Sequence, residues 1–428
     1  MKSMVANTDE KVCPDCNNVI AVIKGYVTWC EKCNWNLQTV KKYVPKSIFE
    51  KIYLSAGEKS SQNLLNSLLQ KVNINSSFSS LKLLTLLTSS IIHLVSLSLS
   101  LFLFGLYLIK SDFPNILFII LGISLIVVAW ITRIKPNKLR ENPLSREHYP
   151  NLYKITDEIS SALNADKVYG IIIDEKFNAS FSQIGWKQQK ILRLGLPLLS
   201  VLNKQELVAL ISHEIAHGIN GDLNRGLWVG SAIQTLSSWY QITKPDKIFD
   251  TRYRTGAIFM IFANILLQLV SKILFFLLYI LCHLNWRDSQ RAEYLADQFA
   301  AKTAGKEAIL SLLNKLHFHD LFEFTILKVI NTKREGHFFQ DFVEQILMVP
   351  AKELERIKRI ELLDNSRLDA THPPTGNRIF YINSLDLEQP NHIIKDETYQ
   401  PIMNELSKLH LLIEKNILDD YKLRYIQY

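Results

Sequence analysis

The stretch His213-Glu214-Ile215-Ala216-His217 decides how the centre of this 428-residue sequence folds. Its two histidines are four residues apart, so on a helix they differ by about 40° around the axis and can bind one ion together. Glu214 is turned by about 100° and can act on water at the metal instead of binding the ion. Zinc acidifies such a water, and a carboxylate can take its proton and return it to a leaving amine. The spacing therefore predicts zinc-dependent peptide hydrolysis.

The residues around this stretch predict an α+β domain. Asn203 is a candidate N-cap with Glu206 three residues later, which approximates a capping box for the helix that carries the histidines. Upstream, Tyr149–Leu163 has helical spacing of apolar residues, and Val168–Ile173 and Ile191–Leu194 resemble short strands. The apolar side of the histidine helix consists of Leu207, Val208, Leu210, Ile211 and Ile215.

A third metal ligand is predicted in the run Arg291-Ala292-Glu293-Tyr294-Leu295-Ala296-Asp297, which looks like the start of a helix. Glu293 would complete a His, His, Glu site and leave a fourth position open for water. Asp297, one turn later, is placed to orient a ligating histidine, which we expect to be His213. The alternative is a solvated charged face for this segment, with the histidine pair buried in a core.

Four of the five cysteines form the pairs Cys13-Pro-Asp-Cys16 and Cys30-Glu-Lys-Cys33. Two such pairs can hold one structural zinc through four thiolates, and the region resembles a zinc ribbon, with asparagine after each pair where ribbons commonly have glycine. Disulfides or a redox pair are the alternatives, but the predicted cytoplasmic location disfavours disulfides. Cys282 lies in an apolar run and is expected to pack there. The ribbon could bind a substrate or a partner, or only stabilise a small terminal domain.

Long uncharged apolar runs indicate an integral membrane protein, and hydrophobic residues make up 48% of the chain. Leu83–Ile109 and Phe113–Thr132 are separated by three residues and predict a transmembrane hairpin. Lysines and arginines precede the first run and follow the second, so both ends should be cytoplasmic. Contact of these flanks with anionic lipid explains the net charge of +8, and no nucleic-acid partner is expected.

A further apolar stretch, Thr255–Trp286, limits the membrane topology. If it crossed the membrane alone, His213 and Glu293 would lie on opposite sides and could not share an ion. The number of crossings between them must therefore be even. Gly226–Thr243 is the natural partner span, which gives four spans in all. Otherwise, Thr255–Trp286 re-enters the membrane or lies within the protein.

An ordered set of motifs, from about Tyr149 to Leu385, resembles the membrane zinc peptidases that include the heat-shock protease HtpX and the CAAX prenyl proteases. By this resemblance, His372 and Arg378 would bind the substrate backbone and stabilise the oxyanion, and Asn178 and Ala179 would belong to an edge strand that binds extended substrate. The cysteine ribbon is an addition to that family's core, and Ser180-Phe181 matches its strand motif imperfectly. The motifs are Phe177-Asn178-Ala179, Leu194-Gly195-Leu196, His213 to His217, Gly221-Asp222, Glu293 with Asp297, and Thr371-His372-Pro373-Pro374 with Arg378. Asp222 would contact the metal ligands without binding the metal itself.

We therefore expect a mainly α membrane protein with a zincin-like α+β metallopeptidase domain, a small edge sheet, transmembrane helices and an N-terminal zinc ribbon. It would span a cell membrane several times, with its N-terminus and active site in the cytoplasm, and would bind one catalytic and one structural Zn²⁺. The expected segments are a zinc ribbon (1–45), a linker with a short amphipathic helix (46–82), a transmembrane hairpin (83–134), the histidine half of the peptidase (140–225), a membrane region with two spans (226–286), and the third-ligand half with C-terminal helices (287–428).

The expected function is a zinc endopeptidase that cleaves membrane or misfolded proteins. Its partners would be a protein or peptide substrate and the lipid bilayer, with a possible protein partner at the ribbon. A CAAX-type prenyl protease and a non-catalytic membrane adaptor are the alternatives. A non-catalytic adaptor would not need a general base at Glu214, which disfavours that alternative. The four-span arrangement has fewer membrane helices than the prenyl proteases, which disfavours the other.

Overall fold

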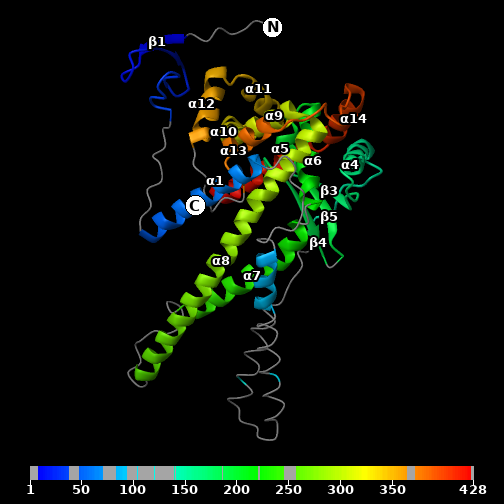
Figure 1. Ribbon diagram of the computed structural model, residues 1–428. Helices are drawn as coiled ribbons and strands as arrows, with labels where there is room; N and C mark the ends of the chain where they lie inside the picture. Colours follow the sequence, from blue (N-terminus) through cyan, green and yellow to red (C-terminus); the bar gives the residue numbers. More distant parts are fainter. Residues whose placement is uncertain are drawn as a thin grey trace.

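The chain forms many helices around one small three-stranded sheet, and a two-stranded sheet lies near its N-terminal end (Figure 1). This computed structural model describes residues 8–37, 48–70, 83–93, 104, 120, 139, 141–185, 187–219, 222–244, 257–363 and 372–425. The strands are β1 (Thr8–Val12), β2 (Val19–Ile23), β3 (Gly170–Asp174), β4 (Ala179–Ile184) and β5 (Gln189–Gly195). The longer helices are α1 (Ile48–Leu69), α4 (Pro150–Ala162), α6 (Lys204–Ile219), α7 (Asp222–Thr243), α8 (Ala257–Ala304), α9 (Lys306–Lys315), α10 (His319–Thr332), α11 (Phe338–Leu347), α12 (Ala351–Leu363), α13 (Thr375–Ser384), α14 (Asp396–Ser407) and α15 (His410–Tyr425). The prediction of a mainly helical fold with small sheets is confirmed.

The three-stranded sheet has the order β3-β5-β4, with β3 parallel and β4 antiparallel to the central β5. Strand β4 is thus an edge strand, and no other strand of the described residues pairs with its outer side. A Cβ at Gly195, the last residue of β5, would overlap the carbonyl oxygen of Lys176. Glycine therefore lets the loop before β4 lie against β5, where Gly195 N donates to Asn178 O at 2.8 Å.

Helix α6, which carries the two histidines, begins with the predicted capping box. Asn203 Oδ1 accepts hydrogen bonds from the backbone N–H groups of Gln205 and Glu206, each at 2.9 Å. In return, the Glu206 carboxylate accepts from Asn203 N at 2.6 Å. Near its other end the helix packs on β4, where a Cβ at Gly218 would lie 2.8 Å from the ring of Phe181. The helix is therefore held at its start and against the edge strand.

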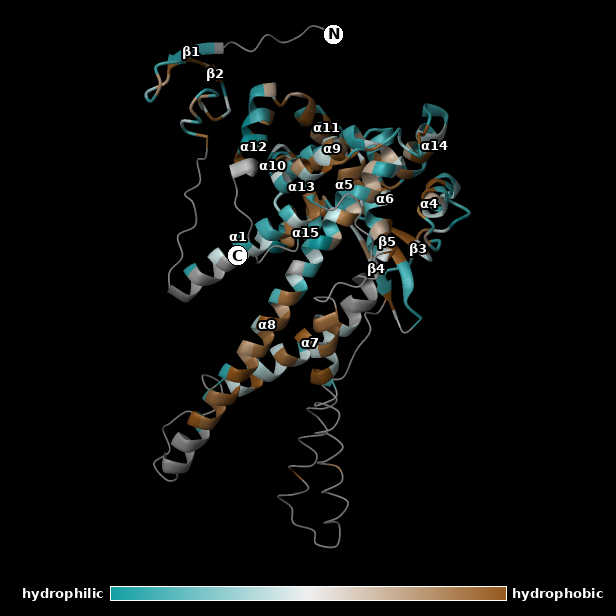
Figure 2. Cartoon of the chain, viewed as in Figure 1, coloured by the Kyte–Doolittle hydropathy of each residue, from teal (hydrophilic) through white to brown (hydrophobic). Residues whose placement is uncertain are grey.

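Helix α8 connects the outlying part of the molecule with the core. Its 48 residues span about 72 Å, and α7 packs against it. Figure 2 shows that α8 is largely hydrophobic where it projects from the rest and more polar where it enters the core, whereas α7 mixes hydrophobic and polar residues. Within the described ranges, one helix is long and apolar enough to cross a membrane, and it is Asn264–Ala304 of α8. Most of the predicted hairpin at 83–134 lies outside the described residues.

Helix α1 occupies most of the segment for which the sequence predicts a linker with a short amphipathic helix. It is 22 residues long, and Leu64, Leu65 and Leu68 are buried against Tyr294 of α8 and Tyr381 of α13. The apolar stripe of the predicted amphipathic helix therefore packs on two helices that carry site residues. Residues 46–47 and 71–82 of the predicted linker lie outside the described residues.

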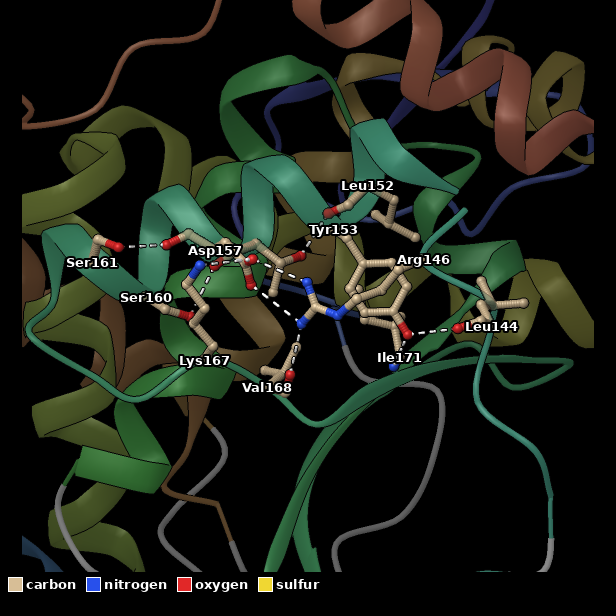
Figure 3. Close-up of polar contacts among 11 residues, drawn as sticks. Leu144, Arg146, Leu152, Tyr153, Asp157, Ser160, Ser161, Lys167, Val168 and Ile171 are labelled. Carbon is tan, nitrogen blue, oxygen red and sulfur yellow. Dashed lines mark hydrogen bonds and ion pairs between the residues drawn. The ribbon is translucent and has the colours of Figure 1, made fainter. Parts of the chain in front are cut away.

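The chain segment that follows residue 140 is fastened to α4 and β3 (Figure 3). Tyr153 Oη donates to Leu144 O at 2.7 Å and accepts from Ile171 N at 3.0 Å. The guanidinium of Arg146 lies 4.3 Å from the centre of the Tyr153 ring and pairs with Asp157 at 3.0 Å. These contacts hold the beginning of the predicted peptidase domain on its own first helix and strand.

Candidate metal centres

The structure brings His213, His217 and Glu293 into one group, although the glutamate comes from α8 and the histidines from α6. The two Nε2 atoms are 3.3 Å apart, and each lies 3.5 Å from an oxygen of Glu293. Zinc bonds of about 2.0–2.2 Å in a tetrahedron separate neighbouring ligand atoms by about 3.3–3.6 Å. The two nitrogens therefore have the spacing of two corners of such a tetrahedron. Glu293 turns Oε2 to His213 and Oε1 to His217, and one of its oxygens lies within 4.8 Å of both nitrogens, so the three residues can hold one zinc ion.

Asp297 lies on the far side of His213 from the other two ligands. Its Oδ1 is 3.1 Å from His213 Nδ1, and its side chain is completely buried. Arg378 donates to both oxygens of Asp297, from Nε at 2.8 Å and from Nη2 at 2.6 Å, while its Nη1 lies 3.5 Å from Glu293. The expected contact of Asp297 with His213 is present, and Arg378 bridges it to the third ligand. The predicted role of Arg378 at the oxyanion stays a prediction.

The charges around His213 control its protonation. Burial lowers the pKa of this imidazole, but the carboxylates of Asp297 and Glu293 outweigh burial and raise the pKa from 6.5 to about 10. The metal-free site therefore favours the imidazolium form of His213 at neutral pH, in which Nε2 carries a proton as well as Nδ1. A metal must displace that proton before it binds Nε2, so metal affinity should fall as the pH falls.

A cavity of about 610 Å³ adjoins the ligands, and His213 is part of its wall. Asn178 precedes β4 and Ala179 begins it, so the edge strand starts at the cavity. His372 Nδ1 lies 2.8 Å from Glu293 Oε1, with 61% of the His372 side chain exposed. The cavity is lined by all the residues predicted for catalysis and substrate binding, namely Glu214, His372, Arg378, Asn178 and Ala179. Their roles remain predictions, and the side chain of Asp222 lies outside the described residues.

Helix α15 also lines this cavity, and we had predicted no role for its residues. They are Ile417, Asp420, Tyr421, Arg424 and Tyr425. No motif marks this helix, and a sequence distance of about two hundred residues from Glu214 gives no sign of contact. Only the packing of α15 on α10 and α11 places it at the site.

The four paired cysteines form a second group of possible metal ligands. Cys13 Sγ lies 3.6 Å from Cys33 Sγ, and Cys16 Sγ lies 3.5 Å from Cys30 Sγ. Disulfide sulfurs are about 2.05 Å apart, whereas zinc–sulfur bonds of about 2.3 Å in a tetrahedron separate the sulfurs by about 3.8 Å. The spacing therefore fits a structural metal and excludes disulfides in this arrangement.

The asparagines that stand after the cysteine pairs in place of glycine have positive φ angles. Asn17 has φ 56° and Asn34 has φ 61°, in the left-handed region. In each pair, the N–H of the asparagine bonds to the carbonyl oxygen of the first cysteine, at 3.0 Å to Cys13 and 2.9 Å to Cys30. Both turns therefore close in the same way and direct their thiols to one point.

The ribbon is docked on one face of α12, near the top of Figure 1. Lys352 and Arg356 donate to ribbon carbonyl oxygens at 2.7 and 3.0 Å. The guanidinium of Arg359 lies 5.1 Å from the centre of the ring of Trp29, which is fully buried. A cationic face of α12 therefore holds the ribbon, and α12 itself packs against α13.

Known proteins share the central part of this chain. A sequence profile of Peptidase family M48 matches residues 152–386. A protein described as a Protease HtpX homolog from Pyrobaculum calidifontis is 25% identical over 244 residues, which cover 56% of this chain and 69% of that protein. Homologs with the same description from Pyrococcus furiosus and Streptococcus equi subsp. zooepidemicus are each 24% identical, over 57% and 64% of this chain and 76% and 85% of their own lengths. No solved structure matches the chain significantly. Since the profile covers more than half of the chain and includes all three ligands, the chain belongs to peptidase family M48 and is a zinc metallopeptidase.

Proposed function

We propose that the protein is a membrane-embedded zinc endopeptidase that cleaves unfolded segments of membrane or misfolded proteins. The observation that carries the proposal is the grouping of the His213, His217 and Glu293 ligand atoms within 4.8 Å of one another, beside a cavity that His213 and Glu214 line. A purely structural site would have four protein ligands and no base beside it. This arrangement has three ligands and a free carboxylate, which suits hydrolysis.

Bound zinc would supply Lewis acidity, which acidifies a water and polarises the scissile carbonyl. Glu214 takes the proton of the attacking water on its carboxylate and then delivers it to the leaving amine. The Asp297 carboxylate lies 3.1 Å from His213 Nδ1 and favours a proton there, so the ring presents Nε2 to the metal. His372 and Arg378 line the cavity as donors, where they can stabilise the developing oxyanion.

The edge strand supports an extended substrate with little sequence preference. The outer side of β4 offers main-chain groups to an added strand, and Asn178 and Ala179 lie where β4 meets the cavity. Main-chain pairing requires a substrate segment that is not already folded. Misfolded proteins and unwound segments of membrane proteins meet this requirement.

Helix α8 supports a location at the membrane. Its apolar residues are largely exposed between Ile265 and Tyr279, and the same helix carries Glu293 near its other end. A bilayer core of about 30 Å would cover roughly 20 residues and leave the ligand outside it. We place the site on the cytoplasmic side, with α7 and α8 and the hairpin at 83–134 as the spans, the ribbon at 1–45, and the peptidase halves at 140–225 and 287–428.

Cleavage of casein by the full-length protein in detergent tests the proposal. Wild type should cleave casein, and Glu214→Gln should lose this activity while keeping its zinc. Retained cleavage in Glu214→Gln would remove Glu214 as the base. A prenylated peptide run in parallel separates the CAAX-type alternative, because that activity would require the prenyl group. An adaptor would cleave neither substrate.

A further inference from the structure

The cavity beside the metal ligands is built in part by a helix outside the region that the family profile matches. The match to family M48 ends at residue 386, whereas α15 spans His410–Tyr425. Nevertheless, Ile417 and Tyr421 line the same cavity as His213 and Glu214. Part of the surface that a substrate would meet therefore lies outside the region that the family profile matches.

Three contacts anchor α15 to the α10–α11 connection and to α11. The Glu414 carboxylate accepts from Gly336 N at 2.6 Å, and Lys422 pairs with Glu335 at 3.2 Å. The ring of His410 stacks on Phe339 with 4.4 Å between the ring centres. These contacts lie along the whole helix, so α15 forms a fixed wall of the cavity.

On the α15 side, the cavity lining is apolar in its buried part and charged nearer the surface. Ile417 is buried in the same core cluster as Leu312, Leu313 and Phe322, which also line the cavity. The α15 charges near them pair with each other, with Arg424 Nη2 at 2.7 Å from Asp420 Oδ2. A surface of this kind favours a bulky apolar group, and on the α15 side of the cavity Asp420 and Arg424 already pair with each other.

We propose that α15 is a specificity wall, and that Ile417 and Tyr421 select a bulky apolar side chain of the substrate next to the scissile bond. The proposal rests on the proposed peptidase function, because the selected residue belongs to the peptide that β4 would hold. Unfolded proteins expose such side chains, whereas folded proteins bury most of them. The wall would therefore add a preference for apolar residues to the sequence-tolerant pairing at the edge strand.

Peptide binding to a cleavage-deficient protein tests the wall without requiring turnover. The probes are fluorescein-labelled peptides that differ at one central residue, which is Phe, Ala or Asp. Their dissociation constants are measured by anisotropy with full-length, zinc-loaded Glu214→Gln in detergent. Tyr421→Ala is then added to this background. Leu423→Ala is the matched control, because Leu423 is on the same helix, 59% exposed and outside the cavity lining.

We expect the Phe peptide to bind at least tenfold more tightly than the Ala peptide, and Tyr421→Ala to reduce this ratio by about tenfold. Leu423→Ala should leave the ratio unchanged. An unchanged ratio in Tyr421→Ala, an equal change in Leu423→Ala, or no discrimination among the peptides would overturn the proposal. Failure of wild type to cleave casein would instead count against the peptidase function, since the binding ratio does not depend on cleavage.

Discussion

Replacing Asp297 by asparagine should weaken zinc binding and destabilise the fold together. Asp297 Oδ1 faces both His213 Nδ1 and Arg378 Nη2, at 3.1 and 2.6 Å, and Oδ2 accepts from Arg378 Nε at 2.8 Å. An asparagine has one oxygen and one NH₂ group. In either orientation it therefore directs a donor at a donor of Arg378 and removes the negative charge.

The magnitude follows from the burial of this pair. Arg378 and Asp297 are both buried, and loss of one partner of a buried ion pair costs about 3–5 kcal/mol. Loss of the carboxylate that orients a metal-binding histidine lowers metal affinity about 10–100-fold. We therefore expect Asp297→Asn to lower the melting temperature and to lose at least tenfold in zinc affinity.

Competition with a chelator measures the zinc affinity, and thermal unfolding of the full-length protein in detergent measures stability. Glu405→Gln is the matched control, because the buried Glu405 accepts from the backbone N–H groups of Asn151 and Leu152 on α4 and does not contact the metal ligands. It should lower stability with no change in zinc affinity. Zinc affinity of Asp297→Asn within twofold of wild type would refute this account of the site.

Two other regions give separate predictions. Cys30→Ser should abolish metal binding by the ribbon and expose Trp29. A red shift of tryptophan fluorescence and faster proteolysis within residues 8–37 would detect this change. A ribbon that stays folded without zinc would contradict the prediction. Burial lowers the pKa of His317 from 6.5 to about 4, so the folded protein favours the neutral imidazole. The contribution of His317 to the free energy of unfolding should therefore be fully present above pH 6.5. It should fall by up to about 3 kcal/mol as the pH is lowered towards 4. His317→Gln should lose less stability over that interval in denaturant titrations, and an equal loss would show that His317 does not contribute.

Much of the metal centre could be predicted because its determinants are local. His213 and His217 are one helical turn apart, and Asn203 with Glu206 marks the start of their helix. Glu293 could be assigned because a third ligand was required, and the structure places it with the histidines. The two cysteine pairs could likewise be recognised, because the turn that brings each pair of thiols together is formed by a few consecutive residues.

Contacts between distant segments could not be predicted in the same way. Nothing near Arg378 in sequence indicates that it pairs with Asp297, 81 residues away. From the sequence alone, the cationic face of α12 is indistinguishable from a solvent-exposed surface. The structure shows that Arg359 stacks on Trp29 of the ribbon. The place of Tyr421 in the cavity depends on how α15 packs against the whole core, which no local pattern records.

Zinc content of purified full-length protein, measured for wild type beside Glu293→Ala, tests the central claim most directly. The two ligand groups predict about two zinc ions per chain in wild type and about one in Glu293→Ala, with casein cleavage lost. Two zinc ions in Glu293→Ala, or full cleavage with only one, would contradict the assignment of His213, His217 and Glu293 as the catalytic site.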